Sequence, residues 1–193
     1  PLITFAIFSR GKSWKVLRRD LMVVACLQLA ALSYGLWTVY LARPVHMVFE
    51  IDRFSVVHAI DVAPESRLKA GPALQREPLW GPTLLAVRPF KDSSEKMEAT
   101  LSEMAGAKLA ARPDFWQPYE SAIPRILAAA HPGPTLLTRF PQRQEEITAV
   151  LARLQRKPDD VVYMSLVSRR EFWTILIDPR DAHILGFIPL DSF

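Results

Sequence analysis

A continuous run of uncharged, mostly apolar residues over positions 21–42 is the strongest pattern in the chain. At a rise of about 1.5 Å per residue, a helix of this length spans about 30 Å, the thickness of the hydrocarbon core of a bilayer. Tyr34, Trp37 and Tyr40 cluster toward its C-terminal end, and aromatic side chains prefer the lipid–water boundary. We therefore predict a transmembrane helix over residues 21–42; the alternative is a helix buried in a large soluble core.

A shorter apolar run over residues 1–9 precedes a cluster of charged residues. This run is too short to cross a bilayer, and it lacks the charged start and the cleavage site of a signal peptide. We expect residues 1–9 to be the end of a truncated transmembrane helix. Residues 10–20 then form the tight loop of a helical hairpin.

The charge of the chain is concentrated in that loop. The formal net charge is +4, and residues 10–20 hold five basic residues against one acid, Asp20. The remaining 19 basic and 19 acidic residues cancel, which gives no basic face for nucleic acid. Because cytoplasmic loops are enriched in Lys and Arg, we predict a cytoplasmic loop and expect residues 43–193 outside the cytoplasm, which in a Gram-negative cell is the periplasm. The five basic residues are Arg10, Lys12, Lys15, Arg18 and Arg19.

One face of the predicted helix carries small and polar residues at helical spacing. Gln28, Ala31, Gly35 and Thr38 lie three or four positions apart. Small residues allow a second helix to approach closely, and an amide within a bilayer seeks a hydrogen-bonding partner. We predict a helix-packing face that is contacted either by further helices of the same protein or by the transmembrane helix of a partner.

Residues 43–193 show strand-like patterns at both ends and helical periodicity between them. The predicted strands cover residues 45–51, 55–62, 83–90, 160–167, 171–178 and 183–190, and the predicted helices cover 92–108, 119–130 and 142–156. Residues 63–82 are rich in Pro and Gly and include Trp80, so we predict an irregular loop there. Strands followed by helices and again by strands favour an α+β domain with an antiparallel or mixed sheet and about three helices.

The sequence contains no recognisable catalytic or metal-binding motif. The four histidines are scattered, and Cys26 is the single cysteine, inside the predicted membrane segment. No phosphate-binding loop or nucleophile elbow occurs. His46 and His58 fall within predicted strands and are interpreted as structural. We therefore predict no enzymatic activity, no metal site and no cofactor.

An aromatic-rich segment over residues 114–126 is a candidate interaction site. Phe115, Trp116 and Tyr119 lie close together there and form a candidate periplasmic partner patch, because aromatic side chains are favoured as interface anchors. The alternative is that two of these three side chains fill the core against the sheet.

Several segments resemble the type IV pilin accessory proteins of the TfpX/TfpZ kind. The similarity is carried by the LRRDL start, the LQLAAL–YG–W–VY helix, the RPV exit and the FEIDRF strand and turn, all within residues 17–57. Weaker agreement appears in RPDFWQPYE and in LIDPRDAHILGFIPLD. The resemblance implies an inner-membrane protein with several N-terminal helices and a periplasmic C-terminal domain. It further implies an accessory factor or chaperone for a type IV pilin, the major pilus subunit, and supplies no catalytic residues.

Two other functional classes make different predictions. A membrane-anchored sensory ectodomain that binds a small ligand predicts a well-formed pocket with converging polar groups. An enzyme predicts a cleft in which titratable groups lie close together. Neither class accounts for the resemblance, so we expect a pilin accessory factor.

Overall fold

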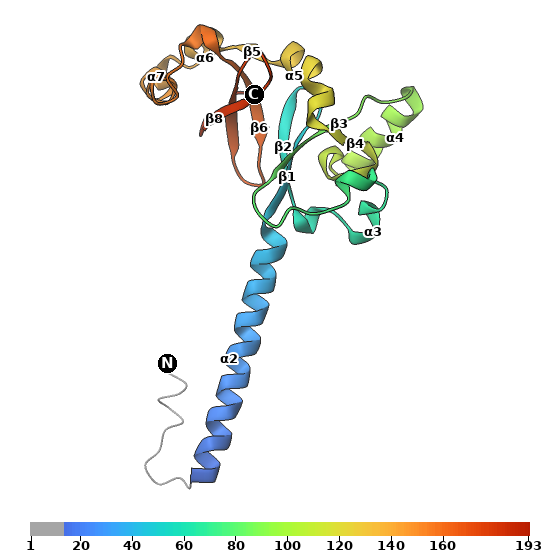
Figure 1. The fold of residues 1–193 in the computed structure, drawn as a ribbon, viewed down its shortest axis with the longest axis vertical. Coiled ribbons are helices and arrows are strands. Elements are labelled where there is room, and N and C mark those ends of the chain that lie inside the picture. The colour runs from blue at the N-terminus through green and yellow to red at the C-terminus, as the bar shows by residue number, and fades with distance from the viewer. Residues whose placement is uncertain (1–13) are drawn as a thin grey trace. The chain divides into compact units, whose positions relative to one another are not determined.

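The computed structural model describes residues 14–193. The predicted helix end over residues 1–9 lies outside these residues, as do Arg10 and Lys12. The chain divides into two units, Pro1–Arg43 and Pro44–Phe193. The first contains a long helix, and the second contains a sheet with several short helices (Figure 1).

The long helix, α2, spans Trp14–Ala42 and has 29 residues. It begins seven residues before the predicted transmembrane segment, because residues 14–20 contain good helix formers and no helix breaker. This part of the predicted loop is therefore helical. The helix ends just ahead of Pro44, since proline disfavours helical geometry in the residue before it. Among the described residues, α2 is the one helix long and apolar enough to cross a membrane.

The second unit is built on one mixed sheet. The strand order is β4-β3-β1-β2-β6-β7-β8, with β5 paired to β6. The β1–β3 and β2–β6 pairs are parallel and the other pairs are antiparallel. The strands are β1 (Pro44–Phe49), β2 (Arg53–His58), β3 (Thr83–Val87), β4 (Trp116–Pro118), β5 (His131–Pro132), β6 (Val162–Val167), β7 (Phe172–Ile177) and β8 (Ile184–Ile188).

Five short α-helices accompany the sheet. They are α3 (Pro64–Arg67), α4 (Ser93–Met104), α5 (Ile123–Ala129), α6 (Gly133–Arg139) and α7 (Gln144–Arg153). The three predicted helices correspond to α4, α5 and α7, while α3 and α6 add short helices that the sequence pattern did not indicate. All six predicted strands are present. The predicted α+β class with a mixed sheet is thus confirmed.

Local sequence signals explain where the predicted helices begin. The Asp92 carboxylate caps α4 by accepting a hydrogen bond from the Glu95 amide at 2.8 Å. The Glu95 carboxylate accepts from Arg88, at 2.7 Å, and from the amide of Lys91. The hydrogen bond from Arg88 lowers the pKa of Glu95 to about 2. Helix α5 has Pro124 in its first turn, where the missing amide costs nothing.

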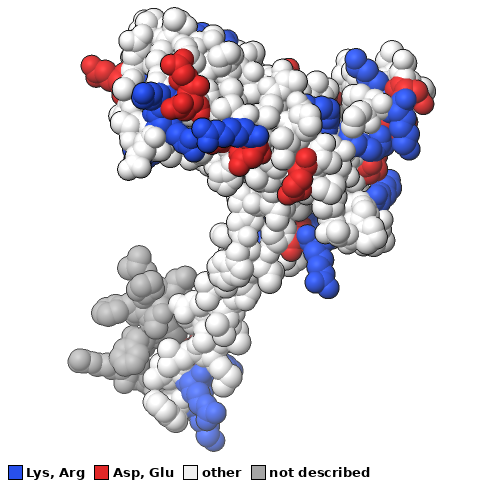
Figure 2. Space-filling view, turned by 45° about the horizontal axis from the view of Figure 1, so that its top comes forward, with Lys and Arg blue, Asp and Glu red and all other residues white. Residues whose placement is uncertain are grey.

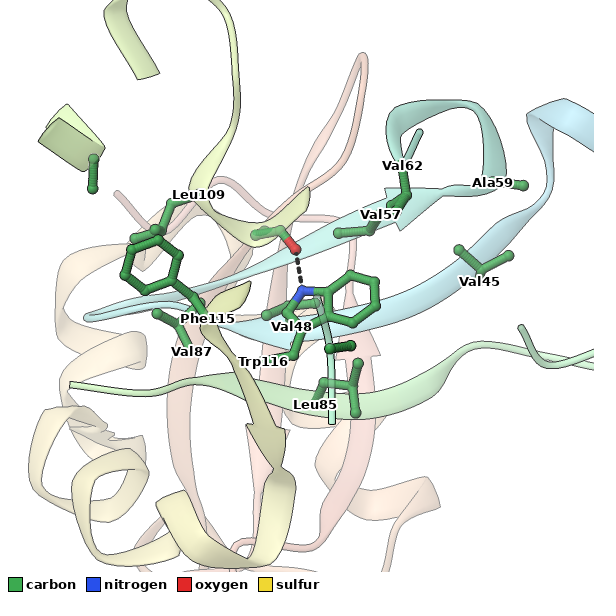
Figure 3. Packing of buried hydrophobic residues seen from close by; sticks show 13 residues of the cluster. Val45, Val48, Val57, Ala59, Val62, Leu85, Val87, Leu109, Phe115 and Trp116 are labelled. Atoms are coloured by element: carbon green, nitrogen blue, oxygen red, sulfur yellow. Dashed lines mark hydrogen bonds between the residues drawn. The ribbon is translucent and has the colours of Figure 1, made fainter. Parts of the chain in front are cut away.

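Strand β1 lies in the middle of the sheet and is covered on both faces. Val45 and Val48 belong to one buried cluster, together with residues of β2 and β3 and of the segment after α4 (Figure 3). Met47 and Phe49 belong to a second cluster on the other face, which includes α5, β6 and β7. Neighbouring side chains of a strand point to opposite faces, which separates Val48 from Met47 and Phe49. The register shift between Pro44 and His46 interrupts this alternation at the start of the strand, where Val45 joins the cluster of Val48. Helices α6 and α7 enclose a third cluster against β6, β7 and β8.

Candidate functional site

The predicted helix-packing face is present on α2 as an exposed stripe. Gln28, Ala31, Gly35 and Thr38 are all exposed. A Cβ atom added at Gly35 would meet nothing within 4 Å. The Thr38 hydroxyl donates to the carbonyl oxygen of Tyr34 at 2.9 Å, so it is already satisfied within the helix. The Gln28 amide, in contrast, has no hydrogen-bond partner among residues 14–193, and it remains available to a second helix.

The two ends of α2 differ in chemistry. Its first turns carry Lys15, Arg18 and Arg19, and Figure 2 shows an uncharged shaft beyond them. At the other end, the rings of Trp37 and Tyr40 stack with centroids 6.0 Å apart. The Arg43 guanidinium lies 3.9 Å from the centroid of the Tyr40 ring and donates to the Tyr40 carbonyl. An apolar shaft between a basic end and an aromatic end matches the pattern of a membrane-spanning helix.

The candidate partner patch in the aromatic-rich segment needs correction, because the structure buries it. Phe115, Trp116 and Tyr119 are all in the core, and Figure 3 shows the first two packed in one cluster. The Trp116 indole donates to the carbonyl oxygen of Ala110 at 2.8 Å, which satisfies its one polar atom. All three side chains therefore pack in the core, one more than the alternative stated, and they offer no surface to a partner.

The buried Tyr119 uses its hydroxyl group for a hydrogen bond within the domain. Its hydroxyl donates to the carbonyl oxygen of Ala182 at 2.7 Å, linking the turn after β7 to the segment before α5. Burial raises the pKa of the Tyr119 hydroxyl to about 12, so it stays protonated and keeps donating. The contact is structural and has no chemistry to offer a substrate.

The two strand histidines have structural surroundings. His46 is buried, its Nδ1 lies 2.7 Å from the Thr83 hydroxyl, and its ring packs edge-on against Trp116 with centroids 4.7 Å apart. His58 is capped by the Asp61 carboxylate, which accepts from the His58 amide at 2.9 Å. Within residues 14–193, no group of three or more His, Cys, Asp or Glu side chains is placed to hold a metal ion.

The burial of His46 predicts a pH-dependent stability. Burial lowers the pKa of His46 to about 4, against an ordinary value of 6.5. As the pH falls, His46 therefore becomes protonated in the unfolded chain at a higher pH than in the folded chain. The part of the free energy of unfolding that depends on neutral His46 is lost between pH 6.5 and pH 4. We expect a loss of about 3 kcal/mol over this range, from about 1.4 kcal/mol per pKa unit. Urea unfolding of the full chain in detergent at pH 7 and pH 4.5 measures it.

A His46→Gln variant provides the control for this pH dependence. Glutamine can still hydrogen-bond the Thr83 hydroxyl but does not titrate. Its stability should change much less between the two pH values. Equal changes in the parent and the variant would assign the pH dependence to other groups.

A polar cleft in the second unit gives little support to a ligand sensor. It has a volume of about 520 Å³ and is lined by α3, the end of α4 and the turns that follow. Asp61 accepts from Arg169 at 2.5 Å, and Asp114 pairs with Arg112 at 2.8 Å. The carboxylates in its wall are thus engaged by arginines of the same chain, and are not free to recognise a ligand.

Two exposed apolar groups on the second unit are less expected. Met97, Leu101 and Met104 form the apolar stripe of α4, yet all three are exposed and only Ala99 of this helix is buried. Periodicity identified the stripe but does not tell which way it faces. Trp80 in the predicted loop is the second case; neighbouring Pro and Gly residues marked a turn, but not an aromatic side chain held in solvent.

Relatives of this chain share one description. The fimbrial assembly protein of serogroup I from Dichelobacter nodosus is 30% identical over 195 residues, which cover 100% of this chain and 76% of the relative. The serogroup E1 protein of the same organism is 29% identical with the same coverage. The protein of serogroups C1 and C2 is 37% identical over 62 residues, 32% of this chain and 47% of that protein. No protein-family profile and no solved structure matches the chain. With a relative of this similarity over its whole length, the chain belongs to the family of fimbrial assembly proteins.

Proposed function

We propose that this chain is an accessory factor of type IV pilus biogenesis, which binds a pilin in the inner membrane and stabilises it until the pilus assembles. Membership of the fimbrial assembly family supports a role in fimbrial biogenesis. The structural observation that carries the proposal is the exposed apolar surface of α2, of which 6% is buried in the most apolar window. Such a surface requires a bilayer and is free to bind another helix there.

The distribution of charge supports one orientation. The basic residues at the start of α2 favour the cytoplasmic side, which supports a periplasmic location for the unit that begins at Pro44. Membrane helix and periplasmic domain together match the two parts of a type IV pilin, an apolar N-terminal helix and a periplasmic head. A helper of this architecture can engage both parts of one subunit.

The proposed binding step uses the stripe of small and polar residues on α2. A pilin helix approaches most closely at Ala31 and Gly35, where no large side chain intervenes. The Gln28 amide then finds its partner on the second helix. Binding the monomer stabilises it by mass action against premature association or proteolysis, and requires neither catalysis nor a cofactor.

Pilin abundance in a deletion strain tests the proposal directly. We expect pilin protein to fall while pilin transcript stays normal, and the complete gene to restore the protein. Unchanged pilin protein and unchanged surface pili would contradict a stabilising role. In that case the sensory alternative becomes the leading hypothesis.

Substitution of Gly35 by leucine tests the proposed helix contact. A leucine side chain at the point of closest approach overpacks the interface, which costs about 1–3 kcal/mol. Because 1.4 kcal/mol corresponds to a tenfold change in affinity, pilin recovered with the Gly35→Leu chain should fall by about tenfold. Co-purification from detergent-solubilised membranes provides the measurement.

Ser33→Leu is the matched control. Ser33 is also small and exposed on α2, but it lies about 160° around the helix from Gly35 at 3.6 residues per turn. The Ser33→Leu substitution adds a similar volume to the opposite face of the helix, so pilin recovery should remain normal. Equal losses from both variants would indicate a general defect of the helix, and no loss from either would exclude this face as the contact.

A further inference from the structure

We infer that the turn over residues 78–82, called here the interfacial turn, is a second membrane contact that inserts Leu79 and Trp80 into the lipid–water boundary. This inference goes beyond binding a pilin, and rests on the part of the proposed function in which α2 spans the membrane. The observations behind it are the exposure of these side chains, the way their segment is held, and its place at one end of the sheet.

Exposure of the interfacial turn is unusual for its residue types. Trp80 is 92% exposed and Leu79 is 75% exposed. Large apolar side chains in water are costly unless something covers them, and an aromatic ring with one polar atom prefers the headgroup region of a bilayer. The turn ends with Gly81, whose φ of +63° lies in the left-handed region that favours glycine, followed by a proline. The sequence thus builds a definite turn to carry these two side chains.

The segment that carries the turn is fastened to the domain. Arg67 forms an ion pair with Glu77, directly ahead of the turn, and also donates to the Val62 carbonyl at 3.2 Å. The Gln75 amide donates to the Ala70 carbonyl at 3.0 Å. These contacts fix the course of the chain on either side of α3. They also engage the Glu77 carboxylate, so the acid next to the turn has a basic partner when the turn approaches lipid.

Strand pairing places the interfacial turn at the end of the sheet where the chain leaves the membrane helix. Strands β1 and β3 are parallel, with His46 opposite Thr83, so both start at the same end. Helix α2 ends at Ala42 and β1 begins at Pro44. At about 3.5 Å per residue, this connection spans at most about 7 Å, whatever the angle between the two units.

The same arithmetic limits how far the turn can lie from the end of α2. Trp80 lies three residues before Thr83, which keeps it within about 10 Å of the start of β3. The headgroup layer is about 5–8 Å thick on each side of the hydrocarbon core. Tyr34, Trp37 and Tyr40 mark the boundary at that end of α2. Chain connectivity therefore keeps Leu79 and Trp80 near the lipid interface, which offers these two side chains apolar surroundings.

Fluorescence quenching by brominated lipid tests this contact on the full chain. The chain is reconstituted in vesicles of phosphatidylethanolamine and phosphatidylglycerol with acyl chains brominated near the headgroup. The loss of emission is compared between the parent and single Trp→Phe variants, which change fold and volume little. We expect Trp80→Phe to remove a lipid-quenched component, and Trp173→Phe, a partly buried domain tryptophan used as control, to remove none.

Trp37→Phe separates failure of the inference from failure of the membrane helix. If Trp37 contributes a quenched component and Trp80 does not, the interfacial turn is not in lipid. If Trp80 emission is not quenched by brominated lipid but shifts in wavelength when purified pilin is added, the inference is overturned in favour of a protein contact. If neither tryptophan is quenched, α2 does not span the vesicle membrane, and both ideas fail together.

Discussion

Trp116→Ala should lower the free energy of unfolding of this protein by about 4 kcal/mol. Removing a buried tryptophan costs about 3–5 kcal/mol, because transfer energy is lost and a cavity remains. The variant also leaves the Ala110 carbonyl without the hydrogen bond that it accepts at 2.8 Å, and it removes the edge-on contact with His46. A loss of this size is a large part of the total stability of a typical domain. The variant should therefore unfold at low urea.

Urea unfolding of the full chain in detergent, followed by circular dichroism, measures this loss. Trp80→Ala is the matched control, since the same change in side chain is made at a 92% exposed position. In detergent, the control should stay within about 0.5 kcal/mol of the parent, as most surface substitutions do. If the two variants lost equal stability, the placement of Trp116 in the core would be wrong.

Gly133→Ala should destabilise the protein by about 3 kcal/mol. A Cβ atom at this position would lie 2.8 Å from the Val161 side chain and 2.8 Å from the Val161 carbonyl oxygen, and closer still to the Pro158 carbonyl. The Gly133 amide donates to the same Val161 carbonyl at 3.0 Å, so the backbone cannot move away without losing that hydrogen bond. Overpacking of a rigid site costs about 1–3 kcal/mol and occasionally more.

A glycine in open surroundings provides the comparison for this effect. A Cβ atom at Gly71 would meet nothing within 4 Å, and its φ of −56° suits any residue. Gly71→Ala should be neutral or stabilise by about 0.4–1 kcal/mol, because alanine restricts the unfolded chain. The same urea titration distinguishes the two positions. A neutral Gly133→Ala would mean that the start of α6 lies farther from the turn before β6.

The sequence pattern predicted those features that depend on local periodicity. The apolar run of α2 and the strands around His46 and Met164 follow from residue spacing alone. Strand β4 was not predicted, because it has only three residues and includes Pro118. Its pairing with β3 also depends on contacts between distant segments. Two or three residues are too few to show an alternating pattern.

The direction in which apolar side chains face was harder to predict than the elements themselves. Phe115 and Trp116 have the composition of an interface but fill the core. Met97 and Leu101 have the spacing of a core-facing stripe but lie in solvent. Periodicity defines one face of an element, whereas tertiary packing decides what that face meets. The small-residue stripe around Gly35 was visible in the sequence because it lies on a single helix.

The parallel pairing of β2 with β6 has a consequence for the time course of synthesis. Arg53 pairs with Ser165, which follows 112 positions later, so the centre of the sheet is completed by the last part of the chain. At about 5–20 residues per second, strand β2 waits roughly 6–22 s for β6 during synthesis. Throughout that interval the outer edge of β2 stays open, because β1 and β3 pair on its other side, and an open edge is prone to aggregation. The sheet therefore cannot be completed until β6 has been synthesised, and shielding of the β2 edge until then would reduce aggregation.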